Sequence, residues 1–123
     1  MPGGILLLDH PPGSFENLAA RLRSELFPVQ ICRTPEELLA AIEKEKPELL
    51  IAAGDFPEIT APQLAEQVYG KLSIPIILVL STAGEETQTF LRRHPAVIGV
   101  YYRPLNIEKI LDRIRRFFNR QEL

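Results

Sequence analysis

The residues that could carry chemistry in this chain are polar side chains that directly follow short apolar runs. Asp9 and His10 lie side by side and combine a carboxylate with an imidazole, both of which are ligands of zinc. A zinc site needs further ligands, and Cys32 and His94 are expected elsewhere in the chain, so we predict no metal there. Arg103 presents a rigid fork of donors that suits an anion. The other candidates at such positions are Asp55, Ser81 and Thr82.

Apolar runs that alternate with amphipathic stretches must position these side chains. Short runs rich in Ile, Leu and Val predict strands that are buried on both faces. The stretches between them repeat apolar residues at helical spacing and predict helices. The predicted strands are Ile5–Leu8, Val29–Cys32, Leu49–Ala53, Ile76–Leu80 and Val97–Tyr102. The predicted helices are Phe15–Leu26, Pro35–Lys46, Pro62–Leu72, Glu85–Arg93 and Ile107–Arg120.

The regular alternation of strand and helix predicts a parallel sheet with helices on both faces, because each crossover returns right-handed. We therefore predict an α/β fold, a flavodoxin-like (βα)5 three-layer sandwich, in a single domain that spans residues 1–123. The strand order 2-1-3-4-5 fits five strands in this length. Ligands of such folds bind at the carboxyl ends of the strands, so the polar residues named above are expected to meet at that edge of the sheet.

Residues with capping chemistry precede the predicted helices. Thr34 offers a hydroxyl at the cap of the second helix, Pro35 suits the first helical position, and Glu37 stands where a capping box needs a carboxylate. The corresponding caps predicted for the first, third and last helices are Ser14, Thr60 and Asn106.

Composition argues against several classes of function. The chain has 123 residues, of which 46% are hydrophobic and 24% charged, as is ordinary for a globular protein. A net charge of −2 gives no bulk field that would attract nucleic acid or an anionic membrane. The longest apolar stretch, from Ile74 to Leu80, is too short to cross a bilayer, and no secretory signal is visible. A single cysteine cannot form an internal disulfide, so we expect a cytoplasmic location.

Taken together, the strand ends resemble those of response-regulator receiver domains of the chemotaxis-regulator type, along essentially the whole chain. In that family an acidic pair follows the first strand, a phosphoacceptor aspartate ends the third, a Ser or Thr follows the fourth, and Lys-Pro follows the fifth. Prolines frame the strands at matching positions here, namely Pro47, Pro57, Pro75 and Pro104.

The chemistry of the pocket departs from the family pattern. Asp9 matches the first acid, His10 replaces the second, and Ala53 stands where the phosphoacceptor aspartate is expected. Ser81 or Thr82 can stand for the hydroxyl residue, and Arg103 replaces the lysine. Phosphoryl transfer needs an oxygen nucleophile and Mg²⁺ bound by carboxylates, and a pocket that retains Asp9 alone of the three acids supplies neither.

The resemblance therefore implies a degenerate pseudo-receiver of two-component or phosphorelay signalling. We expect a non-enzymatic module without a cofactor that acts by protein–protein contact and independently of phosphorylation. One alternative is an active receiver phosphorylated at Asp55, two residues beyond the expected position. A further alternative is a domain that binds a small anionic ligand through Arg103 and Ser81.

Aromatic residues near the C-terminus suggest where a protein partner binds. In receivers the face made by the fourth helix, fifth strand and fifth helix commonly mediates dimerisation or output contact. The resemblance thus implies that a protein partner or a second copy contacts Tyr101, Tyr102, Phe117 and Phe118. Ordinary packing of these aromatics in the core is an equal alternative. The basic residues of the last helix, including Arg113 and Arg116, are interpreted as a solvated face that binds no nucleic acid.

Overall fold

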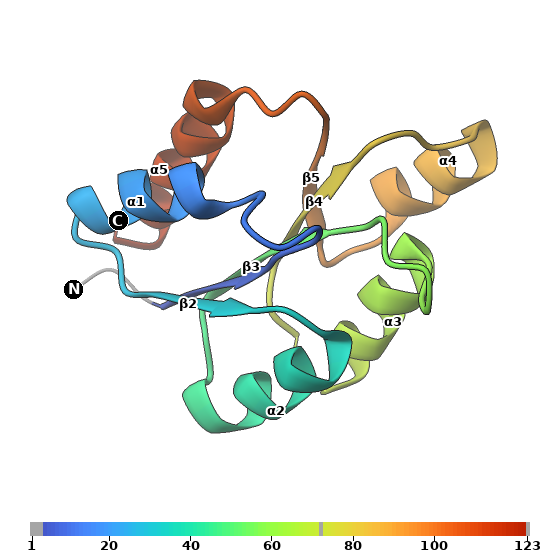
Figure 1. Ribbon diagram of the computed structural model, residues 1–123, viewed down its shortest axis with the longest axis horizontal. Coiled ribbons are helices and arrows are strands. Elements are labelled where there is room, and N and C mark those ends of the chain that lie inside the picture. Colours follow the sequence, from blue (N-terminus) through green and yellow to red (C-terminus); the bar gives the residue numbers. More distant parts are fainter. Residues whose placement is uncertain (1–3, 72, 123) are drawn as a thin grey trace.

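The computed structural model describes residues 4–71 and 73–122, which form one parallel sheet between two layers of helices (Figure 1). The helices α1 and α5 lie together on one face, and α2, α3 and α4 cover the other (Figure 1). The strands are β1 (Ile5–Leu8), β2 (Val29–Cys32), β3 (Leu49–Ala53), β4 (Ile76–Leu80) and β5 (Val97–Tyr102). The helices are α1 (Glu16–Ser24), α2 (Pro35–Glu45), α3 (Ala61–Lys71), α4 (Glu85–Arg93) and α5 (Ile107–Glu122).

The sheet confirms the predicted strands and their order, β2-β1-β3-β4-β5 with all pairs parallel. Every residue of β1, β3 and β4 is buried, as near-continuous apolar strands between two helical layers should be. The edge strands β2 and β5 are partly exposed. In β5 the register shifts where Val97 pairs with Ile76 and Gly99 with Ile77, so Ile98 is an extra residue that bulges from the ladder.

Three of the four predicted helix caps are confirmed. The Thr34 hydroxyl accepts a hydrogen bond from the Glu37 N–H at 3.1 Å. The Thr60 hydroxyl and the Gln63 side chain bond to each other's backbone N–H groups at 3.2 and 2.9 Å, which completes a capping box. The Asn106 side chain accepts from the N–H of Lys109 at 3.2 Å. The third helix begins one residue before its predicted start, and Leu72, its predicted end, lies outside the described residues.

The predicted Ser14 cap is wrong. Helix α1 begins at Glu16, its cap position is Phe15, and the Ser14 hydroxyl donates a hydrogen bond to Asp9 at 2.8 Å. The carboxylate of Asp9 accepts instead from the N–H of Phe15 at 3.0 Å. A side chain from the end of β1 therefore holds the loop that leads into α1, because a carboxylate can accept several hydrogen bonds at once.

Helices α1 and α5 are joined by ion pairs. Arg115 donates two hydrogen bonds to the carboxylate of Glu25, at 2.8 and 2.5 Å, and Arg21 pairs with Glu108 at 2.6 Å. The hydrogen bonds from Arg115 hold the pKa of Glu25 below its ordinary value. In the described part of the chain no helix is both long enough and apolar enough to cross a membrane.

Candidate functional site

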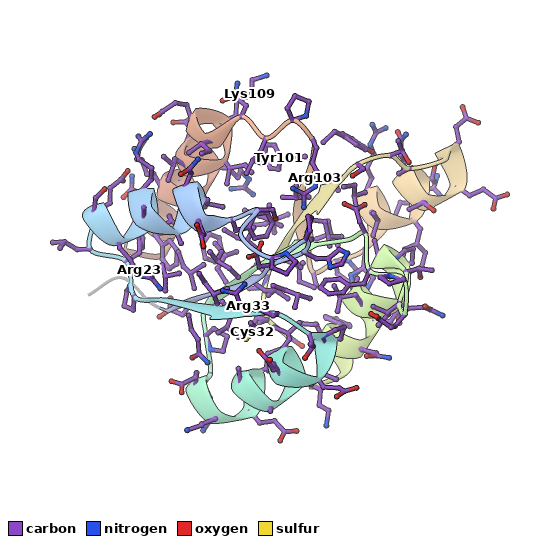
Figure 2. The ribbon with its side chains drawn as sticks, in the orientation of Figure 1. Arg23, Cys32, Arg33, Tyr101, Arg103 and Lys109 are labelled. Carbon is purple, nitrogen blue, oxygen red and sulfur yellow. The ribbon has the colours of Figure 1, made fainter. Side chains whose placement is uncertain are left out.

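The predicted site residues that follow β1, β3, β4 and β5 do come together at the carboxyl edge of the sheet. Asp55 follows β3, Ser81 follows β4 and Arg103 follows β5, and hydrogen bonds join these three side chains. Figure 2 shows Arg103 beside the loop that leads from β1 to α1. This arrangement follows from the parallel sheet, in which all carboxyl ends lie on one edge.

Asp9 is a buried structural carboxylate. Its side chain is fully buried, and its two oxygens accept from the N–H groups of Gly13 and Phe15 and from the Ser14 hydroxyl, at 2.7, 3.0 and 2.8 Å. The guanidinium of Arg33 adds a longer ionic contact of 3.9 Å. Because three donors of one loop already occupy Asp9, its oxygens are committed to holding that loop.

His10 takes part in the cluster through its backbone. Its carbonyl oxygen accepts a hydrogen bond from Nη2 of Arg103 at 2.7 Å. Its imidazole ring stacks on Phe56 with the ring centroids 4.5 Å apart. Among the described residues no three His, Cys, Asp or Glu side chains gather in a way that could hold a metal ion. The His10 side chain therefore packs against an aromatic ring.

Ala53 ends β3 in the core. It is fully buried and pairs with Val79 of β4. The next residue, Gly54, sits where the sheet and α3 approach each other closely: a methyl group added to it would lie 2.1 Å from Cδ2 of Leu80 and 3.1 Å from the Ala61 methyl. The position where the receiver pattern has its phosphoacceptor is therefore a buried member of the hydrophobic core.

Asp55 is the carboxylate that faces the cluster. It accepts from the N–H and the hydroxyl of Ser81 at 3.0 and 3.2 Å, and from Nε of Arg103 at 3.4 Å. About a quarter of its side chain is exposed, 26% against 22% for Arg103. One carboxylate therefore links the ends of β3, β4 and β5. This link between Asp55 and Arg103 was not predicted from the sequence.

Arg103 has its donors distributed over several partners. Besides Asp55 and the His10 carbonyl, its guanidinium carbon lies 5.7 Å from the centre of the Phe15 ring, within the range of a cation–π contact. Phe15 and Phe56 support the site and were missed, because their apolar periodicity reads as core. Thr82, the other candidate hydroxyl, is exposed, and among the described residues its side chain forms no hydrogen bond.

Cys32 lies at the end of β2, where its carbonyl accepts from the N–H of Asp9 at 2.8 Å, and His94 lies at the end of α4. The Cys32 thiol is buried in the sheet, and this burial raises its pKa. His94 follows α4, where Nε2 lies 2.8 Å from a carboxylate oxygen of Glu66 on α3 and Nδ1 accepts from the N–H of Ala96. His94 thus ties α3 to the start of β5.

The four aromatics predicted as a partner surface differ in exposure. Tyr102 is 40% exposed, whereas Tyr101 and Phe117 are partly buried and pack against the core. Phe118 is only 5% exposed, and its ring lies 5.1 Å from that of Phe27. Its assignment to an exposed surface is therefore wrong, and Phe118 is a core residue. The Phe117 ring lies edge-on against that of Phe118, with the centroids 5.0 Å apart, so Phe117 packs at the rim of the core that Phe118 enters.

No family model matches this chain, and no curated protein matches it.

Solved structures, in contrast, match it over nearly its whole length. A response regulator receiver domain protein (CheY-like) from Methanospirillum hungatei JF-1 superposes with a TM-score of 0.87 at 24% identity, covering 99% of this chain and 98% of the other. A two-component response regulator from Clostridium difficile gives a TM-score of 0.88 at 15% identity, covering 98% of each chain. The chemotaxis protein CheY4 of Vibrio cholerae gives 0.81 at 18% identity, covering 94% and 98%. The chain therefore has the CheY-like receiver fold.

Proposed function

We propose that the chain is a receiver-like signalling module that acts by protein contact and independently of phosphorylation. The observation that carries this proposal is the internal pairing of Asp55 with Ser81 and Arg103. The Asp55 carboxylate, which could bind Mg²⁺, and the Arg103 guanidinium, which could bind a phosphoryl group, are instead bound to each other. Asp9 is likewise held by its own loop, and Ala53 has no oxygen nucleophile.

The second candidate function is an active receiver with Asp55 as phosphoacceptor. It is favoured by one observation, namely that the Asp55 side chain points toward Ser81 and Arg103 and is partly exposed. Against it, the carboxylate would have to leave both partners before attacking a phosphorus atom. Mg²⁺ also needs oxygen ligands in octahedral geometry, and the other acid of the edge, Asp9, is committed to backbone donors.

Exposure to acetyl phosphate and Mg²⁺, followed by intact mass measurement, separates these two functions. We expect no gain of a phosphoryl mass by the chain. A phosphoryl adduct that is absent from Asp55→Asn would establish Asp55 as an acceptor and contradict the proposed function. The Asp55→Asn protein is a matched control, because asparagine retains an acceptor oxygen for Ser81 at nearly the same volume.

Binding of a small anion at Arg103 is the third candidate, and it has less support. The guanidinium already donates to Asp55 and to the His10 carbonyl. An anion in solution would therefore have to compete with the Asp55 carboxylate of the same chain. We expect phosphate and sulfate to leave the melting temperature unchanged at low millimolar concentration. A rise in melting temperature that Arg103→Ala abolishes would support the anion site instead.

The proposed contact surface is the face formed by α4, β5 and α5. Tyr102 is the exposed aromatic residue of β5, and tyrosine is favoured at interfaces because it buries a large area with few rotatable bonds. The partner is a protein, either another molecule or a second copy.

A further inference from the structure

The edge strand β5 offers backbone groups to a partner. Arg103 donates its N–H to Leu80 of β4 at 2.9 Å, whereas the Ile98 carbonyl accepts from the Arg113 side chain of α5 at 3.3 Å and so faces away from β4. Backbone groups alternate in direction along a strand, so the N–H and C=O groups of Val100 and Tyr102 also face outward. In the described part of the chain, a side chain bonds to the outward carbonyl of Ile98 and to no other outward backbone group of β5.

A groove runs along this edge. It has a volume of about 240 Å³ and lies between Gln88 and Arg92 of α4 and the β5 residues from Val97 to Val100, with Tyr102 beyond them. No residue of β5 is buried, in contrast to the fully buried strands β1, β3 and β4. An open strand edge at the floor of a groove is a site where an extended segment can add as a new strand.

The charges around the groove identify the kind of segment. Arg92 lines it from α4, and Arg113 reaches the strand from α5. The acidic residues of α4, Glu85 and Glu86, lie in the first turn of the helix, about 10 Å along its axis from Arg92. Positive charge on both sides of an edge strand favours an acidic partner.

The same charges argue against a second copy at this edge. Two β5 strands paired with each other would bring the arginines of both chains together, and like charges across an interface oppose association. The bulge at Ile98 and the covering guanidinium of Arg113 further block one end of the strand. The free edge is thus confined to Val100 and Tyr102, which suits a short segment.

We propose that β5 binds a short, extended, acidic segment of a partner protein, which adds to the sheet as a sixth strand beside Val100 and Tyr102. This inference rests on the proposed function, because it specifies the partner of the α4–β5–α5 face. Backbone hydrogen bonds would supply the main contact, and Arg92 and Arg113 would select acidic side chains.

The test is a selection of random twelve-residue peptides displayed on phage against the full chain. We expect the recovered peptides to be enriched in Asp and Glu and to bind more weakly as salt concentration rises. In the chain labelled with ¹⁵N, the amides of Val100 and Tyr102 should exchange quickly with solvent when free. They should become protected, at least tenfold, when the strongest synthetic peptide is bound.

Two proline variants give a matched control. Val100→Pro removes an outward N–H from β5 without removing a bond to β4, and we expect it to weaken peptide binding at least tenfold. Ile31→Pro makes the same change on the opposite edge, since Cys32 directs its carbonyl to Asp9 and Ile31 therefore faces outward. Binding to Ile31→Pro should be unchanged. Arg92→Glu should weaken binding several-fold while leaving the backbone edge intact.

The outcomes separate this inference from the function on which it rests. Peptides that need Tyr102 but protect neither amide and tolerate Val100→Pro would overturn strand addition and retain the contact face. Recovery of basic or neutral peptides, or of none, would also overturn the inference. The proposed absence of phosphorylation is decided separately by the acetyl phosphate measurement, whose result does not depend on any peptide.

Discussion

Asp9 and Asp55 follow two neighbouring strands, β1 and β3, yet they hold the structure together in different ways. Asp9 is fully buried and accepts hydrogen bonds from donors within the six residues that follow it. Asp55 is partly exposed and bonds to Ser81 and Arg103, which are 26 and 48 residues away in the sequence. One carboxylate organises a loop, and the other connects three strands.

The difference between the two carboxylates lies in how much each contributes to stability. A carboxylate that is saturated by backbone N–H groups stabilises its loop and cannot be given up without leaving buried donors unpaired. A carboxylate that is paired with an arginine at the surface contributes little to stability, because water screens the pair. We therefore expect Asp9 to matter for folding, whereas Asp55 matters mainly for the arrangement of the edge.

The largest expected effect is that of Asp9→Ala. It leaves the N–H groups of Gly13 and Phe15 and the Ser14 hydroxyl without their acceptor, and we expect the free energy of unfolding to fall by about 3 kcal/mol. Urea denaturation followed by circular dichroism measures the change. Asp9→Asn, which keeps one acceptor oxygen, should lose less. Equal stability of the alanine variant and the native chain would remove the distinction between the two carboxylates.

Gly54→Ala tests whether the β3 loop is held by packing rather than by Asp55. The added methyl would meet Leu80 and Ala61, so we expect a loss of about 2 kcal/mol in the free energy of unfolding. Gly70 of α3 is the matched control, because a methyl group there would meet nothing within 4 Å. Gly70→Ala should be neutral or stabilising, since alanine favours helix. If both variants behave alike, close packing does not fix the Asp55 loop.

A double-mutant cycle on Asp55 and Arg103 should give a smaller effect. We expect the coupling between Asp55→Asn and Arg103→Gln to be about 1 kcal/mol or less, because both side chains are partly exposed. Chemical denaturation of the four proteins supplies the value. A coupling of about 3 kcal/mol would place Asp55 in the same class as Asp9 and contradict the comparison.

The smallest effect concerns pH, with Glu25 as a reference carboxylate that is exposed about as much as Asp55, 28% against 26%. Arg115 lowers the pKa of Glu25 below 4.5, so this pair stabilises the fold above pH 4.5 and the contribution is lost as pH falls through the lowered pKa. Glu25→Gln should therefore make the loss of stability on acidification below pH 4.5 shallower. Thermal melts of both proteins between pH 6 and pH 3 measure this. Parallel curves would mean that the Arg115 pair does not contribute.

The fold could be predicted from the sequence because each element carries its own signal. Apolar runs such as Leu49–Ala53 specify buried strands, and caps such as Thr34 begin the helices at the expected residues. The members of the site were predicted because the topology brings the strand ends together. The partners within the site were not, since side-chain direction beyond a strand end depends on loop geometry. For this reason the bond of Asp55 to Arg103 and the role of Asp9 as the acceptor for the loop before α1 were missed.

The two edges of the sheet share a feature with consequences for the behaviour of the chain in concentrated solution. Arg113 covers the Ile98 carbonyl on β5, and Arg23, labelled in Figure 2, donates to the Val29 carbonyl on β2 at 3.2 Å. When both edge strands of a sheet are open, each can pair with an edge strand of another molecule, and the molecules can then form a polymer. Each guanidinium places a charge in the path of such growth. Loss of both arginines would thus favour filaments, whereas loss of one would leave the other edge blocked and end association at a pair of molecules, even though each molecule remains fully folded.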